Sequence, residues 1–147
     1  TAADHVGVGP CSINSSTLSG SLAVSIDVGL QLIEPRSDGE LYISFLAVRE
    51  FRPVVTIRCL GSPAVTYGLN GTALTALTVY LRKCATTGRV ANATEEHISF
   101  TATAGLITVP EVSGGNNNEA ITTIRCELIG ANATTVPLAV DTTAAIA

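Results

Sequence analysis

The sequence predicts an all-β protein: a β-sandwich or barrel-like domain with a long β-hairpin, extended terminal arms and at most one short helix. Three observations support this prediction. Apolar residues alternate with polar or small ones from residue 22 to residue 33. Shorter runs rich in Val, Ile, Thr and Tyr follow along the chain. Turn-forming residues separate these runs about every ten residues, as in sandwiches and barrels.

The alternating segment over 22–33 is expected to be one long strand. Its even-numbered residues form an apolar face and Asp27 lies on the opposite face, which is the period-two pattern of a half-buried strand. Residues 34–40 contain Pro and Asp-Gly and are expected to turn the chain into a second apolar run over 41–48. A two-stranded ribbon is not stable alone, so we expect its exposed face or edge to meet another sheet. The residues assigned to self-assembly are Leu22, Val24, Ile26, Val28, Leu30, Leu32, Leu41, Ile43 and Phe45.

The remaining elements follow from shorter patterns. Residues 74–84 fit both helical and strand spacing, but Thr75, Thr78 and Val79 favour a strand. Strands are expected over 54–60, 76–84, 97–103, 106–109 and 121–129, with loops over 61–72 and 113–119.

The 147 residues fit a single domain. Residues 131–147 are small, contain Pro137 and carry a charge only at Asp141, so they cannot bury much surface by themselves. We expect this C-terminal arm to be disordered or to lie on a neighbour, and an N-terminal arm over 1–10 is expected as well.

The composition predicts a homo-oligomer. Charged residues make up 14% of the chain, against roughly 25% in an average soluble domain. Lys83 is the one lysine among eight basic residues. Interfaces deplete Lys and Glu and retain Arg, because an ammonium group is harder to desolvate than a guanidinium. An alternative origin is compositional drift, or an extracellular protein rich in Thr and Ala.

We do not expect the protein to be an enzyme, and no cofactor, metal or small-molecule substrate is expected. His5 lies near a terminus. His97 follows Glu95 and Glu96, and neighbouring residues of a strand point to opposite faces, which does not suit a metal or acid–base site. We interpret His97 as a polar residue at a strand end. The chain has no phosphate-binding glycine loop, nucleophile elbow or Asp-x-Asp calcium loop.

Membrane insertion and nucleic-acid recognition are not expected either. The stretches without charge over 5–26 and 59–81 are interrupted by polar, Gly or Pro residues, so neither forms the apolar helix of about 20 residues that spans a bilayer. Lys and Arg are not clustered with aromatic residues as in a nucleic-acid groove.

Cysteines and sequons bear on the cellular compartment. Cys11, Cys59, Cys84 and Cys126 form no CxxC pair, and we expect free buried thiols, whereas disulfides would imply an oxidising compartment. Asn-x-Ser/Thr sequons occur at Asn14, Asn70, Asn92 and Asn132, and glycosylation of them would accompany secretion.

The order of features resembles the major tail proteins of long-tailed phages and prophages. The similarity lies in the opening strand at 8–13, the hairpin at 22–33 and 41–48, and the stretches 79–83 and 96–100. The helix that commonly packs on the sandwich of that family is not clearly present, unless 73–84 supplies it. The resemblance implies a virion protein assembled in the host cytoplasm, with six copies in a ring and rings stacked into a tube. The hairpins would line a lumen that passes DNA without sequence-specific binding, the terminal arms would reach the next ring, and Asp27 is the lumen candidate.

Two other functions fit the same observations. A secreted filament, pilus-like or cell-surface β-sandwich subunit would explain the sequons and the cysteines, and would need disulfides or donated strands. A capsid-decorating protein or small binding module would be a compact monomer or trimer.

Overall fold

The computed structural model describes residues 5–18, 20–33, 47–61, 71–85, 88–114, 120–130 and 134–146. The described part is all-β and contains no helix, as the sequence predicts. Its strands are β1 (His5–Ile13), β2 (Ser16–Thr17), β3 (Ser21–Asp27), β4 (Leu30–Ile33), β5 (Ala47–Phe51), β6 (Val54–Leu60), β7 (Thr72–Leu74), β8 (Leu77–Ala85), β9 (Gly88–Arg89), β10 (His97–Ala102), β11 (Gly105–Ser113), β12 (Ile121–Leu128) and β13 (Ala139–Ala144).

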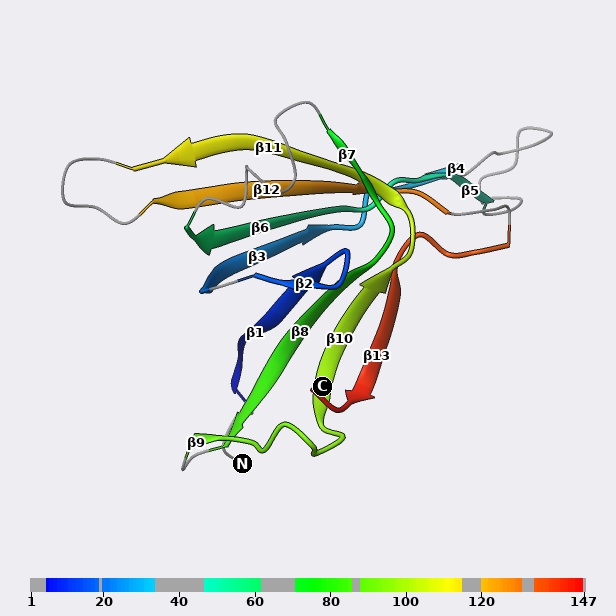
Figure 1. The fold of residues 1–147 in the computed structure, drawn as a ribbon. Coiled ribbons are helices and arrows are strands. Elements are labelled where there is room, and N and C mark those ends of the chain that lie inside the picture. The colour runs from blue at the N-terminus through cyan, green and yellow to red at the C-terminus, as the bar shows by residue number, and fades with distance from the viewer. Residues whose placement is uncertain are drawn as a thin grey trace.

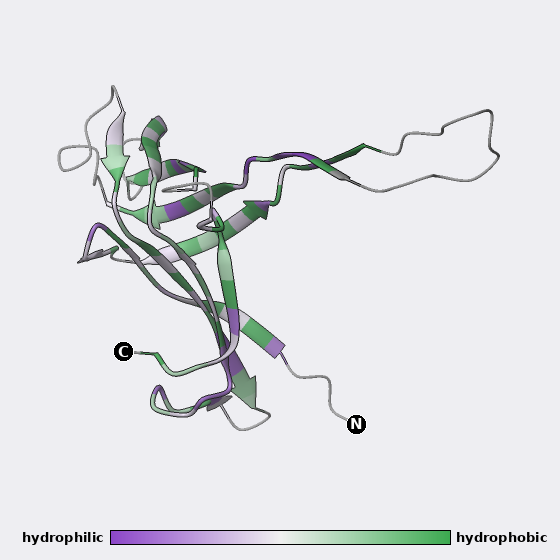
Figure 2. Ribbon diagram, turned by 90° about the vertical axis from the view of Figure 1, so that its right-hand side faces the viewer, coloured by the Kyte–Doolittle hydropathy of each residue, from purple (hydrophilic) through white to green (hydrophobic). Residues whose placement is uncertain are grey.

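The strands form two main antiparallel sheets and one separate ribbon. The first sheet has the order β13-β10-β8-β1-β2, with β9 added to β8, and the second has the order β3-β6-β12-β11-β7. The second sheet lies across one end of the first, whose strands continue past it as a stem (Figure 1). Among the described strands, β4 and β5 pair only with each other, and they extend away from the body (Figure 2). The arrangement is an open, sandwich-like fold, and the described strands close no barrel.

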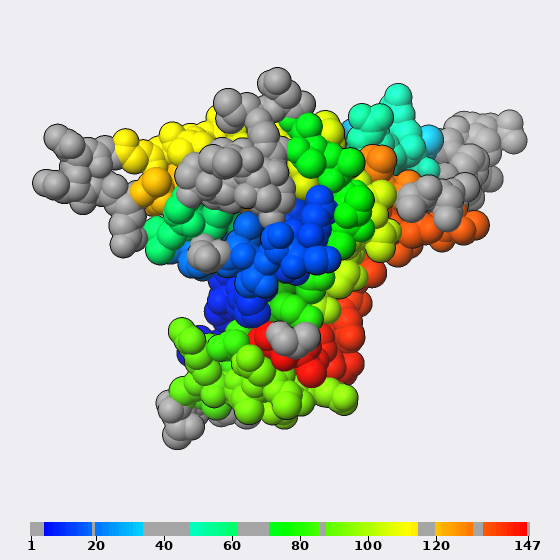
Figure 3. Space-filling model, viewed as in Figure 1, coloured from blue at the N-terminus to red at the C-terminus, as the bar shows by residue number. Residues whose placement is uncertain are grey.

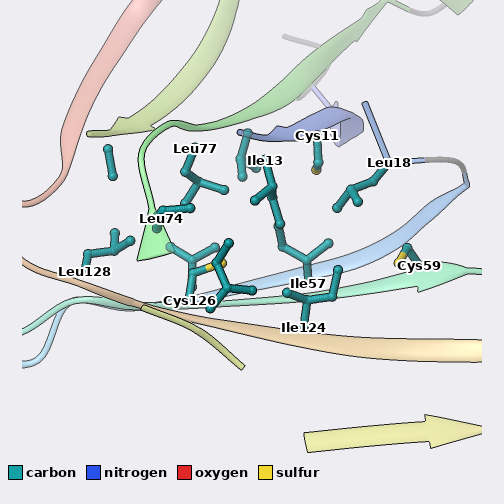
Figure 4. Packing of buried hydrophobic residues seen from close by; sticks show 14 of the residues in the cluster. Cys11, Ile13, Leu18, Ile57, Cys59, Leu74, Leu77, Ile124, Cys126 and Leu128 are labelled. Carbon is teal, nitrogen blue, oxygen red and sulfur yellow. The ribbon is translucent and has the colours of Figure 1, made fainter. Parts of the chain in front are cut away.

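The hydrophobic core lies between the two main sheets (Figure 4). Alternate residues of β6 and β12 point into it, while Arg58 and Arg125 on the same strands are exposed. Leu77 and Val79 of β8 meet them from the first sheet. The period-two pattern of the sequence therefore corresponds to real burial in these strands. The largest buried apolar side chains are Ile13, Ile57, Leu77, Ile107, Ile124 and Leu128.

The alternating segment over 22–33 forms two strands, β3 and β4, so the prediction of one continuous strand is wrong. The break falls at Gly29, whose φ of +56° is rarely adopted by residues with a side chain. Asp27 Oδ1 accepts a hydrogen bond from the Gly29 N–H (3.0 Å), and the Arg52 N–H donates one to the Gly29 carbonyl (3.3 Å). These hydrogen bonds fix a kink in the chain. β3, before the kink, belongs to the second sheet, and β4, after it, belongs to the ribbon.

The hairpin is present, and the described part of its return strand begins at Ala47. β4 pairs with β5 from Ile33↔Ala47 to Leu30↔Phe51, and β3 pairs with β6 from Asp27↔Val54 to Ser21↔Cys59. Within the described residues, the returning chain covers 47–60. Of the predicted run over 41–48, residues 41–46 lie outside the described residues.

Parts of both expected terminal arms belong to the first sheet. Residues 5–10 form the start of β1 and pair with β8, beginning at His5↔Cys84. Residues 139–144 form the edge strand β13 beside β10. Ala144 and Ile146 are buried. These segments are strands of the domain rather than arms, because their backbones pair with β8 and β10. Residues 1–4, 131–133 and 147 lie outside the described residues.

The other strand predictions are confirmed with modest shifts in boundaries. The ambiguous segment near residue 80 is the strand β8, not a helix. The strand expected over 106–109 is longer and runs to Ser113, with a shift of register between Thr108 and Glu111 that accommodates Pro110. The predictions over 54–60, 97–103 and 121–129 correspond to β6, β10 and β12.

Candidate assembly surface

The β4–β5 ribbon carries an apolar face that no described element covers. Leu30 lies opposite Phe51 and Leu32 opposite Val48, so these four side chains share one side of the ribbon, which we call the apolar ribbon face. Leu30 is 50% exposed, Leu32 45% and Val48 60%. Side chains of this size stabilise a protein when they leave water, at roughly 25 cal/mol per Å² of apolar surface. Because about half of the surface of these side chains remains in water, much of this stabilisation is not realised in a single copy of the chain.

The edge of the second sheet continues from this ribbon. β3 is the outermost strand of that sheet and pairs, among the described strands, with β6 alone. It contains no Lys or Pro, and its charge is at its last residue, Asp27. Natural edge strands usually avoid pairing with other chains through such charges, prolines or bulges. β3 has few of these protections, apart from a shift of register between Ser21 and Ala23.

Exposed apolar side chains are concentrated in this region. Six of the exposed large hydrophobic residues lie on β3, β4, β5 or their junctions: Leu22, Val28, Leu30, Leu32, Ile33 and Val48. The others are spread over the molecule: Val6, Val8, Leu106, Val112, Ile129, Val136 and Val140. Scattered exposed hydrophobic residues are ordinary, but four of these six, Leu30, Leu32, Ile33 and Val48, lie on the projecting ribbon, and such a concentration marks an interaction surface.

The structure places the predicted self-assembly residues in three groups. Leu22, Val28, Leu30 and Leu32 are exposed on β3, the kink and β4. Val24 and Ile26 are half-buried and pack against the core. Leu41, Ile43 and Phe45 lie outside the described residues. The structure therefore places Leu30 and Leu32 on the ribbon, Val28 beside its base and Leu22 at the far end of β3, whereas Val24 and Ile26 stabilise the domain itself.

Sequence reasoning missed two members of the apolar ribbon face. Val48 and Phe51 are three residues apart, so strict alternation would place them on opposite faces. The register shifts between Gln31 and Leu32 because Arg49 is an extra residue in β5, and this shift puts Val48 and Phe51 on the same face. The sequence contains no signal for this bulge.

Asp27, the lumen candidate, lies at the kink between body and ribbon. Its side chain is exposed, and its Oδ1 atom accepts the hydrogen bond from the Gly29 N–H. This contact gives Asp27 a local structural role in the turn. The structure does not test the predicted lumen role.

The four cysteines are free thiols, as expected. Cys11, Cys59 and Cys126 are buried and Cys84 is half-buried. Burial raises the pKa of all three buried thiols, and that of Cys126 to about 12. A thiol reacts as its thiolate, so these three side chains are poor nucleophiles and serve as core residues.

His97 is completely buried and links β8 to the segment that follows β9 through hydrogen bonds to the backbone. Its Nδ1 atom accepts a hydrogen bond from the Lys83 N–H (3.1 Å), so Nε2 carries the proton and donates to the Ala91 carbonyl (3.0 Å). Both ring nitrogens are therefore used by the backbone. Within the described residues, no group of three or more His, Cys, Asp or Glu side chains could hold a metal ion.

The sequon residue Asn14 is occupied by backbone contacts. Asn14 Oδ1 accepts hydrogen bonds from the Thr75 N–H (2.8 Å) and the Ala76 N–H (3.2 Å), and its Nδ2 donates to the Ala73 carbonyl (3.0 Å). A glycan on Nδ2 would compete with the contact to Ala73. Asn14 therefore acts as a clamp between the end of β1 and the turn before β8.

No described helix is long and apolar enough to cross a membrane. Comparison of the sequence with protein-family models and with curated proteins finds no match. The fold and the exposed surface define an all-β domain with an apolar ribbon that no described strand covers.

Proposed function

We propose that this chain is a structural subunit that assembles with copies of itself through the β4–β5 ribbon. The observation that carries the proposal is the apolar ribbon face, formed by Leu30, Leu32, Val48 and Phe51 on an element that projects from the body. A copy of the same chain is the partner whose chemistry fits, since a second ribbon would cover this face with an identical apolar face.

The stability of the ribbon supports this partner. An isolated two-stranded ribbon is marginal in water, and β4–β5 has four register pairs beyond the kink. Addition of a neighbouring ribbon would pair the free backbone groups and bury the apolar side chains at once. The low charge of the chain, 14%, has the same explanation, because a surface covered by neighbours needs few charges.

The particular assembly that we propose is a tail tube of stacked rings around a lumen that conducts DNA. The resemblance to tail proteins of long-tailed phages suggests it, and an all-β body with a projecting ribbon is compatible with it. In such a ring the ribbons would lie side by side, with Asp27 at the base of each. The protein would then act by assembly and conduction, without making or breaking a bond.

The secreted-filament alternative has less support. It would favour disulfides and glycans, whereas the four cysteines are free and Asn14 is engaged with the backbone. Asn92 is exposed, and its Oδ1 accepts a hydrogen bond from Arg82 Nη2 (2.7 Å). Asn70 and Asn132 lie outside the described residues.

Electron microscopy of the purified protein over a range of concentrations tests the proposal. We expect rings or hollow tubes for the wild-type chain. Leu32→Asp should raise the concentration needed for assembly by about a hundredfold or more, because burial of an unpaired carboxylate costs several kcal/mol.

Leu106→Asp is the matched control, because Leu106 lies on β11 and is 46% exposed, against 45% for Leu32. It should assemble like the wild type. Wild-type protein that stays monomeric at every concentration would overturn self-assembly itself. Equal loss of assembly in both variants would reject the role of the ribbon alone, and solid thin fibres would favour the filament.

A further inference from the structure

A cavity of about 590 Å³ opens on the stem, away from the apolar ribbon face. The first half of β1 forms one wall, the start of β3 lies above it, and the segment after β9 together with Ile146 lies below it. Figure 3 shows this part of β1, in dark blue, set back between the broad upper part of the molecule and the foot formed by residues 88–96. The space is large enough for a small molecule or a short peptide end.

Two arginines line this cavity, and no acidic residue does so among the described residues. Arg82 donates from Nη2 to Asn92 Oδ1 (2.7 Å), which orients its guanidinium. Arg82 Nε is buried and has no hydrogen-bond partner within the described structure. The Arg89 side chain forms no ion pair or hydrogen bond with any other described residue. A buried donor without a partner is costly, and an anion would satisfy it.

Within the described residues, no carboxylate forms an ion pair with either arginine. Glu96, on the same segment as Asn92, forms an ion pair with Lys83 (3.0 Å), and Glu95 is exposed outside the cavity. The cavity therefore concentrates two positive charges in a chain whose net charge is −4. Arginine is the side chain best suited to bind oxyanions, because its planar fork matches two oxygens of a carboxylate or phosphate.

Small residues add backbone and hydroxyl groups to the same wall. Gly7 and Gly20 line the cavity without a side chain that would shield their peptide groups. The Ser21 hydroxyl also lines it, is buried beside the Cys11 sulfur, and has no oxygen or nitrogen partner within the described structure. One buried donor without a partner in the described structure, Arg82 Nε, and one hydroxyl whose partner is the Cys11 sulfur, Ser21 Oγ, thus border one cavity.

We propose that this cavity binds an oxyanion, a phosphate or carboxylate group, through Arg82 and Arg89. Asn92 is a positioning residue that holds the Arg82 guanidinium. The Ser21 hydroxyl and the exposed peptide groups of β1 complete the site. This inference is independent of assembly through the ribbon, since the two surfaces share no residue.

The thiol of Cys84 supplies a direct readout, because it lines the same cavity and is half-buried. Its rate of alkylation by uncharged iodoacetamide would be measured on dilute wild-type protein, with inorganic phosphate titrated at constant ionic strength against chloride. Phosphate should slow the reaction of Cys84 in a saturable manner. A parallel titration with acetate distinguishes a phosphate site from a carboxylate site. Protection by neither anion, or by chloride equally, would overturn the proposal.

Variants of the two arginines test whether they bind the anion that protects Cys84. Arg89→Gln, at an exposed position, should weaken binding of the protecting anion by about tenfold or more, which is the usual contribution of a hydrogen bond to a charged group. Arg58→Gln is the matched control, because Arg58 is exposed on β6 and is not part of this cavity. Arg82→Lys keeps the charge while it removes the fork, and should weaken binding as well. Unchanged protection in Arg89→Gln and Arg82→Lys would reject the site.

Discussion

Ile57 of β6 and Ile124 of β12 are direct cross-strand partners, and each is the second residue of a Thr-Ile-Arg-Cys segment. The strands are antiparallel, so the two segments meet in a local two-fold arrangement centred on this pair. Both isoleucines are fully buried. The repeated tetrapeptide thus reflects two adjacent strands in the same environment, with Ile and Cys inside and Arg outside.

Replacement of Ile57 by Ala should lower the free energy of unfolding by about 2–5 kcal/mol, because the change leaves a cavity in a core that cannot collapse around it. Ile124→Ala should do the same, and the double variant should deviate from additivity because the two side chains are neighbours. Urea denaturation measures these values. Val112→Ala, at an exposed position of β11, is the control, and a loss below about 1 kcal/mol at Ile57 would contradict this description of the core.

Gly29→Ala should destabilise the protein and disturb the kink at the base of the ribbon. A Cβ atom at this position would collide with the Arg52 carbonyl oxygen. Gly61 is the matched control, since its φ of +86° is also left-handed but no atom lies within 4 Å of the added Cβ. Gly61→Ala should lose about 1 kcal/mol from backbone strain alone, and Gly29→Ala clearly more. Equal losses in thermal unfolding would show that the contact with Arg52 is unimportant.

Stability should fall at alkaline pH through Cys126. Burial raises the pKa of this thiol from 9.0 to about 12, so the folded state keeps a proton that the unfolded state releases. The contribution of the neutral thiol is therefore fully present below pH 9 and is lost as the pH rises towards 12. Urea midpoints measured across this range should decline less steeply in Cys126→Ala than in the wild type. Cys84→Ala is the control, and an identical slope in Cys126→Ala and the wild type would contradict the assignment.

Asn14→Ala should destabilise the domain by about 2–3 kcal/mol, because several hydrogen bonds to residues 73–76 disappear together. Asn14 also has a φ of 48°, which Asn tolerates better than Ala. Asn92→Ala removes one side-chain hydrogen bond, the one that Asn92 Oδ1 accepts from Arg82, and should lose about 1 kcal/mol. Chemical denaturation compares the two. Mass spectrometry after expression through a secretory pathway should find Asn14 without a glycan, and a fully glycosylated, stable Asn14 would refute the clamp.

Period-two alternation predicted the core strands well, because their burial is regular. In β12, Ile124 and Cys126 are inside and Arg125 is outside, as the pattern indicates. The same rule failed at Gly29, because the even-numbered apolar residues continue through the kink and conceal it. Only the close approach to Arg52, a tertiary contact, reveals the break.

Other features depend on partners that lie far away in the sequence. β13 contains no large apolar residue except Val140, and its place is decided by pairing with β10. The basic cavity joins Arg82 and Arg89 to glycines near the N-terminus, which no local pattern indicates. The complete burial of His97 likewise arises from the segment that folds over it.

The continuity of the ribbon with the second sheet has a mechanical consequence. β4 continues into β3 and β5 into β6, so tension on the ribbon is transmitted along strands that reach into the core. To extract β6, such a pull would have to shear its ladder with β12, in which seven residue pairs from Ile121↔Leu60 to Glu127↔Val54 resist together. A subunit held by its ribbon would therefore carry load through a ladder of seven residue pairs at the centre of the second sheet.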